Sequence, residues 1–166
     1  GLIYGISAFG LTRSTDLTLA ESEDFVAAYF EKFPGVKRYL DNIRKVATEQ
    51  GYVETLLGRR RYFPALQNLA NQQVRNREER EAINAPIQGT AADIMKISML
   101  HVAKALQDAK LGAKRLLQVH DEVVIECPES ELEITIEVVT KAMEEAYSLD
   151  IPLSTEARSG LTWGDL

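Results

Sequence analysis

The sequence predicts an α+β fold in which helices pack on a small antiparallel sheet. Apolar residues recur at spacings of three and four in several segments, which is typical of amphipathic helices. Two other segments have the alternating, turn-interrupted pattern of β-hairpins. With 166 residues, 45% of them hydrophobic, the chain is long enough to bury an ordinary core without disulfides. No internal repeat or long linker separates these segments.

The first segment, residues 1–11, has no capping signal before it, so we expect the sequence to be a piece of a longer protein. Thr18 and Glu21 then form a capping-box pattern, which predicts a helix over residues 18–33. The side chains expected on its buried face are Phe25, Ala28, Tyr29 and Phe30.

Pro34 and Gly35 interrupt the pattern, and a second helix is predicted over residues 36–50, ended by Gly51. Its expected buried positions are Val36, Leu40, Ile43 and Ala47. Residues 52–63 then predict a β-hairpin that turns at Leu57-Gly58-Arg59 and is closed by Pro64.

Residues 67–84 are polar and predict a helix, which we expect Pro86 and Gly89 to separate from a second helix over residues 90–109. Gly112 is expected to end that second helix. Its predicted buried face consists of Ala91, Ile94, Met95, Ser98, Met99, Val102 and Leu106.

Residues 116–126 are the strongest hairpin candidate, with a turn at His120-Asp121 and Pro128 after the second strand. A helix is expected over residues 129–148, and an edge strand over 153–160. The helix is expected to bury Leu132, Ile136, Val139 and Met143.

Charge is divided unevenly along the chain. Residues 1–115 carry 17 Lys and Arg against 13 Asp and Glu, whereas residues 116–166 carry 2 against 12. A basic part can bind phosphates while an acidic part holds cations or faces solvent, although a chance fluctuation of surface charge is an alternative.

The single cysteine, Cys127, excludes a disulfide scaffold and favours a reducing compartment. No apolar stretch is long enough for a membrane span.

Asp121 and Glu122 are adjacent carboxylates at the tip of an otherwise apolar hairpin. Ionising both is costly unless a divalent cation lies beside them, and strand alternation points them to opposite faces. We therefore expect Asp121 as a direct metal ligand and Glu122 as a supporting group. A solvated acidic turn is the alternative.

Arg80, Asn84 and Gln88 are spaced by four residues, which places three hydrogen-bond donors in one row of a helix. Such donors suit the DNA minor groove, where every base pair offers an acceptor regardless of sequence. An exposed polar helix face is the alternative. The run Arg59-Arg60-Arg61 offers phosphate contacts or a solvated turn. Tyr4 is followed by Gly5, which would allow a base to approach the ring closely, although packing of the ring in the core is the alternative. His120 could donate a hydrogen bond to a phosphate or a sugar, or it could cap the turn.

Five ordered blocks resemble the C-terminal polymerase region of family A DNA polymerases, the bacterial DNA polymerase I type. The blocks are GLIYG at 1–5, YFEKFPGV at 29–36, GYVETLLGRR at 51–60, EREAINAPIQGTAAD at 79–93 and QVHDE at 118–122. The resemblance covers essentially the whole chain. It implies that residues 1–74 are the remainder of a fingers subdomain and that residues 75–166 are a portion of the palm.

The resemblance implies template-directed addition of deoxynucleotides to a primer 3′ end by two-metal-ion catalysis, in DNA replication and repair. It assigns a Mg²⁺-binding carboxylate to Asp121, a supporting role to Glu122 and a place near the primer terminus to His120. Arg80, Asn84 and Gln88 match positions that contact the DNA primer-template, and Tyr4 matches an aromatic that sets nucleotide geometry. The implied partners are primer-template DNA and deoxynucleoside triphosphates. No membrane partner is implied, and the implied location is cytoplasmic and nucleoid-associated.

The family's first metal carboxylate belongs to a motif of the type Asp-Tyr-Ser-Gln-Ile-Glu-Leu-Arg, which these 166 residues do not contain. We therefore expect the isolated chain to be inactive, and we expect exposed apolar surface to favour self-association. The alternatives are a catalytically inert DNA-binding remnant and a metal-dependent nuclease that uses Asp121 and Glu122. The nuclease lacks the further carboxylates that such a site needs.

Overall fold

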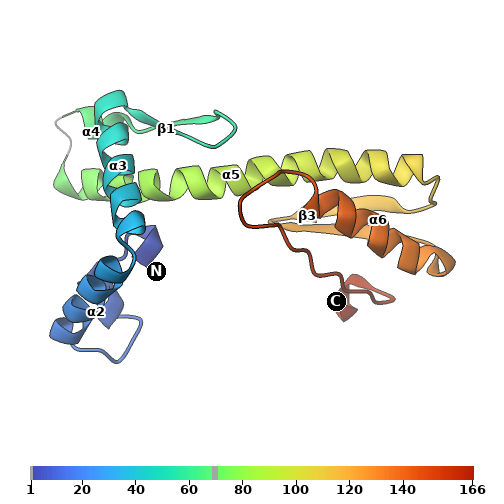
Figure 1. Cartoon of the computed structure of the whole chain (residues 1–166), viewed down its shortest axis with the longest axis horizontal. Coiled ribbons are helices and arrows are strands. Elements are labelled where there is room, and N and C mark those ends of the chain that lie inside the picture. Colours follow the sequence, from blue (N-terminus) through green and yellow to red (C-terminus); the bar gives the residue numbers. More distant parts are fainter. Residues whose placement is uncertain (1, 69–70) are drawn as a thin grey trace. The chain divides into compact units, whose positions relative to one another are not determined.

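A computed structural model describes residues 2–68 and 71–166. The chain divides into two compact units, one ending at Thr90 and the other spanning Ala91–Leu166. Helices predominate and each unit contains one small antiparallel sheet, so the predicted α+β class is confirmed (Figure 1). Helix α5, Gln72–Asp108, contributes its first half to the first unit and its second half to the second unit.

The first unit begins with a 3₁₀ turn, η1, at Leu2–Tyr4, and a short helix, α1, at Ala8–Thr12. Helix α2 follows at Leu19–Lys32, and the predicted capping box is present at its start. Thr18 Oγ1 accepts from the Glu21 amide at 3.3 Å, and the Glu21 carboxylate accepts from the Thr18 amide at 2.8 Å. The hydrogen bonds to Thr18 hold the pKa of Glu21 below its ordinary value.

The predicted buried face of α2 is wrong. Phe25 is 52% exposed and Ala28 is also exposed, while Tyr29 and Phe30 are half-buried. Two aromatic rings of this helix pack on each other, with the Tyr29 ring centroid 5.4 Å from that of Phe30. Ser22, which is small, is instead the buried residue of α2. A contact surface that admits only a small side chain leaves the larger apolar groups at its edge.

Helix α3, Pro34–Gln50, confirms the second predicted helix. Leu40 and Ala47 are buried, and Val36 and Ile43 are half-buried. Gly51 ends the helix as predicted, because its φ of 75° is in the left-handed region that favours glycine. Its amide donates to the Ala47 carbonyl at 2.9 Å.

The first predicted hairpin is also confirmed, with strands β1, Tyr52–Glu54, and β2, Arg60–Tyr62. A four-residue helix, α4, Pro64–Gln67, follows it. The hairpin, α3, α4 and α5 together form the core of this unit, and Figure 1 shows them gathered around the first half of α5. The buried residues of that core are Ala47, Val53, Phe63, Leu66, Ala82 and Ala85.

The largest difference from the sequence prediction is the continuity of α5. It runs through Pro86 and Gly89 as one helix of 37 residues, and it begins at Gln72 rather than at residue 67. Residues 69–70, within the predicted helix, lie outside the described residues. Proline inside a helix removes one backbone hydrogen bond and costs about 3 kcal/mol. Burial of Ala82, Ile83 and Ala85 around Pro86 offsets this cost.

In the second unit, α5 buries Met95, Ser98, Val102 and Leu106, as predicted. Ile94 and Met99 are half-buried, whereas the expected burial of Ala91 is wrong. Asp93 is buried, which the apolar pattern does not predict. The helix ends at Asp108 rather than at Gly112, so that prediction is wrong, and Lys110, with φ 54°, adopts a left-handed conformation after the helix.

The second predicted hairpin is confirmed by β3, Lys114–Val119, and β4, Glu122–Glu126. The strands are antiparallel, with an irregularity between Arg115 and Leu117. The Arg115 guanidinium donates to the Met99 carbonyl at 2.6 Å and so attaches β3 to α5.

The C-terminal part contains a 3₁₀ turn, η2, at Glu129–Glu131, helix α6 at Leu132–Glu144, and η3 at Trp163–Asp165. Helix α6 is shorter at both ends than predicted, and its four expected core residues are only half-buried. Its buried residue is Thr135. The edge strand expected over residues 153–160 is wrong, because this segment is irregular and joins α6 through the Thr155 amide, which donates to Glu144.

Within residues 2–68 and 71–166, no helix combines the length and the apolarity needed to cross a membrane.

Candidate nucleic-acid interface and metal ligands

The β3–β4 hairpin presents His120, Asp121 and Glu122 at its tip. Val119 pairs with Glu122, so His120 and Asp121 form a two-residue turn. His120 has a φ of 53°, in the left-handed region where histidine is more frequent than most residues. The Gln118 side-chain amide donates to the His120 carbonyl. This tight turn fixes the backbone from which the Asp121 side chain projects.

The side chains of this tip face solvent. His120, Asp121 and Glu122 are all exposed. Among the described residues, no ion pair involves either carboxylate. Both carboxylates are therefore accessible to an external cation or ligand.

The donor chemistry of this tip suits a hard divalent cation, because carboxylate oxygens are the ligands that Mg²⁺ prefers. The number of ligands is insufficient for a closed site. No cluster of three or more His, Cys, Asp or Glu side chains with metal-binding geometry occurs in the described part of the chain. A cation bound at Asp121 and Glu122 would therefore need further ligands from water, substrate or another segment.

The predicted donor row lies on the first half of α5. Because the helix is continuous through Pro86, Arg80, Asn84 and Gln88 keep helical spacing and follow one side of it. Arg80 and Gln88 are exposed, and Asn84 is half-buried. The Asn84 Oδ1 atom is enclosed without a hydrogen-bond partner among the described residues. The amide Nδ2 of Asn84 is then the group that suits an external acceptor.

The Tyr4-Gly5 pair lies beside the same helix. The Tyr4 side chain is 46% exposed, so the core-packing alternative for this ring is wrong. Gly5 has a φ of 74°, and a Cβ atom there would lie 3.3 Å from Ile83 Cδ1 and 3.7 Å from Arg80 Cγ. The structure therefore brings the turn that carries Tyr4 to the part of α5 that carries Arg80.

The arginines of the first hairpin contact groups of the protein itself. Arg60 pairs with Glu54 at 2.7 Å, and Arg61 pairs with Glu81 of α5 at 2.6 Å. Arg77 also pairs with Glu81, at 2.8 Å, and its hydrogen bond holds the pKa of Glu81 below the ordinary value of 4.5. These contacts favour a structural role for the arginines over the phosphate contacts considered from the sequence.

The sequence did not reveal a close contact at Gly89. The Arg59 Nη2 atom donates to the Gly89 carbonyl at 2.9 Å, and the Leu56 amide donates to Thr90 Oγ1 at 3.0 Å. A Cβ atom at Gly89 would lie 2.6 Å from Thr55 Cγ2. An isolated glycine inside a helical pattern often marks close packing of this kind, so the signal was present but was interpreted as a helix break.

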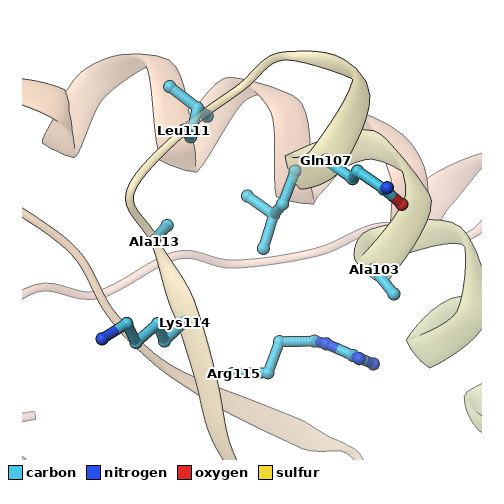
Figure 2. Close-up of a pocket in the computed structure, with 7 residues that line it drawn as sticks. Ala103, Gln107, Leu111, Ala113, Lys114 and Arg115 are labelled. Atoms are coloured by element: carbon cyan, nitrogen blue, oxygen red, sulfur yellow. The ribbon is translucent and has the colours of Figure 1, made fainter.

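The predicted site residues thus form two groups. Tyr4, Arg80, Asn84 and Gln88 belong to the first unit, and His120, Asp121 and Glu122 belong to the second. The second unit also contains an open pocket of about 360 Å³ between the end of α5 and the start of β3 (Figure 2). Arg115 and Lys114 line it, at the opposite end of β3 from the His120-Asp121 turn. This pocket is therefore separate from the carboxylate tip.

A known protein family matches almost the whole chain. Residues 1–165 match the model of DNA polymerase family A. The chain belongs to DNA polymerase family A. It is 46% identical over 165 residues to DNA polymerase I of Geobacillus stearothermophilus, covering 99% of this chain and 19% of that protein. It is 47% identical over 163 residues to DNA polymerase I of Streptococcus pneumoniae, covering 98% of this chain and 18% of that protein.

A solved structure supports the same relationship. The fold is similar to that of the polymerase domain of Pol1 from M. smegmatis in complex with DNA primer-template and dNTP, with a TM-score of 0.87 and 45% identity. The match covers 93% of this family A chain and 27% of that one. The chain thus spans about a fifth of the length of the curated relatives it matches. Membership of the family implies, in general terms, the use of a divalent metal.

Proposed function

We propose that this chain is part of a DNA-directed DNA polymerase that adds deoxynucleotides to a primer 3′ end, in DNA replication and repair. The observation that carries the proposal is an exposed Asp121 on a tight hairpin turn, in a chain whose residues 1–165 match family A. We assign residues 1–74 to the fingers and residues 75–166 to the palm. The two compact units meet at Thr90, inside helix α5, and are distinguished by contacts within the chain. The boundary at residue 74 follows instead from the resemblance to the family.

In this proposal Asp121 is a direct ligand of Mg²⁺ and Glu122 supports it. Both side chains are exposed oxygen donors, which is the donor type that Mg²⁺ requires. A bound magnesium ion would neutralise triphosphate charge and acidify the primer hydroxyl. The remaining ligands come from outside the described residues of this chain. His120 lies next to Asp121 in the same turn, which is consistent with a hydrogen bond to the primer terminus.

The second part of the proposal is that Arg80, Asn84 and Gln88 contact the minor groove of the primer-template. Their donors follow one side of α5, and the acceptors at purine N3 and pyrimidine O2 are present in every base pair. Tyr4 is exposed, and the neighbouring Gly5 lies close to Arg80 of α5. We assign the Tyr4 ring to contacts with the templating base and the incoming deoxynucleoside triphosphate. The protein would then check base-pair geometry without preferring a sequence.

The minor-groove role can be tested with a chemically altered duplex. Gln88→Ala should weaken binding of a primer-template about fivefold, which corresponds to one neutral hydrogen bond. Replacing purine N3 by carbon at the contacted pair should weaken wild-type binding equally and should leave the variant unaffected. Fluorescence anisotropy measures both, and Gln107→Ala, an exposed glutamine later on the same helix, is the matched control. Equal sensitivity of wild type and variant to the altered base would contradict the assignment.

The isolated chain should not extend a primer, because the carboxylates it contributes complete only part of a metal site. Incubation with primer-template, Mg²⁺ and all four deoxynucleoside triphosphates tests this. Robust extension would contradict the account of the active site, while DNA binding without extension is the expected result.

We also propose that the isolated chain self-associates through exposed apolar side chains of the second unit, and that the polymerase is cytoplasmic and associated with the nucleoid. Leu100 is 70% exposed on α5, and Leu116 and Leu117 are 54% and 47% exposed on β3. Exposed leucines of this kind favour association. Sedimentation that shows a monomer at every concentration would contradict the self-association.

A further inference from the structure

The turn of the first hairpin donates hydrogen bonds to the two residues of α5 that follow Gln88. The Thr55 amide donates to the Arg59 carbonyl and the Arg59 amide donates to Thr55 Oγ1, which closes a tight loop. From this loop, Arg59 reaches the Gly89 carbonyl and the Leu56 amide reaches Thr90 Oγ1. Two consecutive residues of the helix thus accept hydrogen bonds from one turn of the hairpin.

A second attachment lies earlier on the same helix. Arg61 of β2 binds Glu81 at 2.6 Å, and Val53 and Phe63 pack against Ala82 and Ala85. Glu81 and Gly89 are eight residues apart, so the hairpin spans about 12 Å of α5. Asn84 and Gln88 lie between the two attachments.

The spanned segment is the part of α5 with the weakest intrinsic preference for helix. It contains Pro86, which removes a backbone hydrogen bond, and Gly89, a poor helix former. A helix with these two residues is prone to bend or fray unless other contacts hold it. The hairpin supplies those contacts on the side where the glycine leaves room.

We propose that the Thr55–Arg59 turn positions Gln88. Its hydrogen bonds to Gly89 and Thr90 hold this part of α5 in place and so fix where the Gln88 amide meets the minor groove. Gly89 is then required for its lack of a side chain, because a Cβ atom would displace the turn. Thr55, Gly89 and Thr90 act in this proposal as positioning residues. This inference rests on the proposed minor-groove role of Gln88.

Gly89→Ala separates positioning from folding. Alanine is the better helix former, so the helix itself should not lose stability, but the new Cβ meets Thr55 Cγ2 at 2.6 Å and should push the turn away. We expect the variant to lose the roughly fivefold advantage of an ordinary duplex over the N3-lacking duplex. Adding Thr55→Ser removes the clashing methyl group and keeps the hydroxyl, so the double variant should recover that advantage.

Thr90 provides an independent test in the full chain. Thr90→Val keeps the shape of the side chain but removes the acceptor for the Leu56 amide, whereas Thr90→Ser keeps that acceptor. Amide hydrogen exchange at Leu56 should accelerate at least about tenfold in Thr90→Val and remain near wild type in Thr90→Ser. Duplex discrimination should follow the same order.

The outcomes distinguish this inference from the proposed function. If Gln88→Ala leaves duplex discrimination unchanged, the minor-groove role is wrong, and the positioning role is wrong with it. If Gln88→Ala abolishes discrimination but Gly89→Ala preserves it, only the positioning role is overturned. Failure of Thr55→Ser to rescue Gly89→Ala also overturns it. Loss in Gly89→Ala with recovery in the double variant supports it.

Discussion

The two hairpins of this chain differ in the surroundings of their turns. The tip of β1–β2 is fastened to α5 by the Leu56 amide and by Arg59, and its arginines pair with Glu54 and Glu81. The tip of β3–β4 carries His120, Asp121 and Glu122 in solvent, and its carboxylates form no ion pair within the described part of the chain.

The two hairpins therefore differ in whether their polar groups have partners within the protein. A hairpin whose polar groups are satisfied inside the protein adds rigidity to its neighbour. A hairpin whose charged tip is left without internal partners presents that charge to something outside. Under the roles that we propose, the first hairpin holds the helix that contacts DNA and the second offers a carboxylate to a metal.

The largest effect should come from the tip of the second hairpin. In a polymerase that contains this chain, Asp121→Asn should reduce primer extension at least about a thousandfold, because the metal contributes several kcal/mol to the transition state. Binding of primer-template should change only a few-fold. Glu126→Gln, exposed at the far end of β4, is the control and should extend normally. Primer extension by Asp121→Asn at the wild-type rate would show that the tip of the second hairpin does not have the proposed role in catalysis.

The next effect concerns the core beneath the first hairpin. Phe63 is 2% exposed, so Phe63→Ala should lower the free energy of unfolding by about 3 kcal/mol. Leu117, 47% exposed on β3, is an exposed apolar residue of the second hairpin, and Leu117→Ala should cost less than about 1 kcal/mol. Chemical denaturation measures both variants. Similar losses would mean that both hairpins are equally part of a core.

A smaller effect should distinguish the two turns. Gly58 has a φ of 81°, so Gly58→Ala should destabilise the protein by about 1 kcal/mol. His120 has a φ of 53° without being glycine, so His120→Gly relieves local strain and should change stability by less than about 0.5 kcal/mol. Thermal unfolding measures the stability of both variants. An equal loss of stability in Gly58→Ala and His120→Gly would contradict this difference between the two turns.

The smallest effect is a pH dependence of the first hairpin. The Arg77 hydrogen bond and the nearby Arg61 lower the pKa of Glu81, so this group stabilises the fold above its ordinary pKa of 4.5. That stabilisation is lost as pH falls through the lower folded-state pKa. Because the ion pairs are partly exposed, the expected contribution is below about 1 kcal/mol. Glu81→Gln should remove this acid-dependent part from the unfolding curve; an unchanged curve would contradict the role of the pair.

The sequence predicted the elements whose signals are local. The capping box at Thr18, the left-handed Gly51 and the His120-Asp121 turn each depend on a few adjacent residues, and all three are present. The family blocks also pointed to Asp121 and to the donor row on α5, although the roles of these residues stay predictions.

The features that the sequence did not predict depend on tertiary contacts. Pro86 reads as a helix break, but α5 continues because its neighbours Ala85 and Ile83 are buried in the core and the hairpin lies against the segment. The pattern predicts Phe25 as a core residue, but Phe25 is 52% exposed and Ser22 is the buried residue of α2. The contact between Thr55 and Gly89 joins residues 34 positions apart, so the isolated glycine could indicate close packing but not the partner.

The most direct test of the contrast between the hairpins is amide hydrogen exchange, measured on a polymerase that contains this chain, with and without primer-template and Mg²⁺. We expect the Leu56 amide to be protected in both states, because Thr90 already accepts its hydrogen bond. We expect the Asp121 amide to exchange rapidly without DNA and slowly in the complex. Rapid exchange at Leu56 without DNA, or an Asp121 amide that does not respond to the complex, would contradict the contrast between the hairpins.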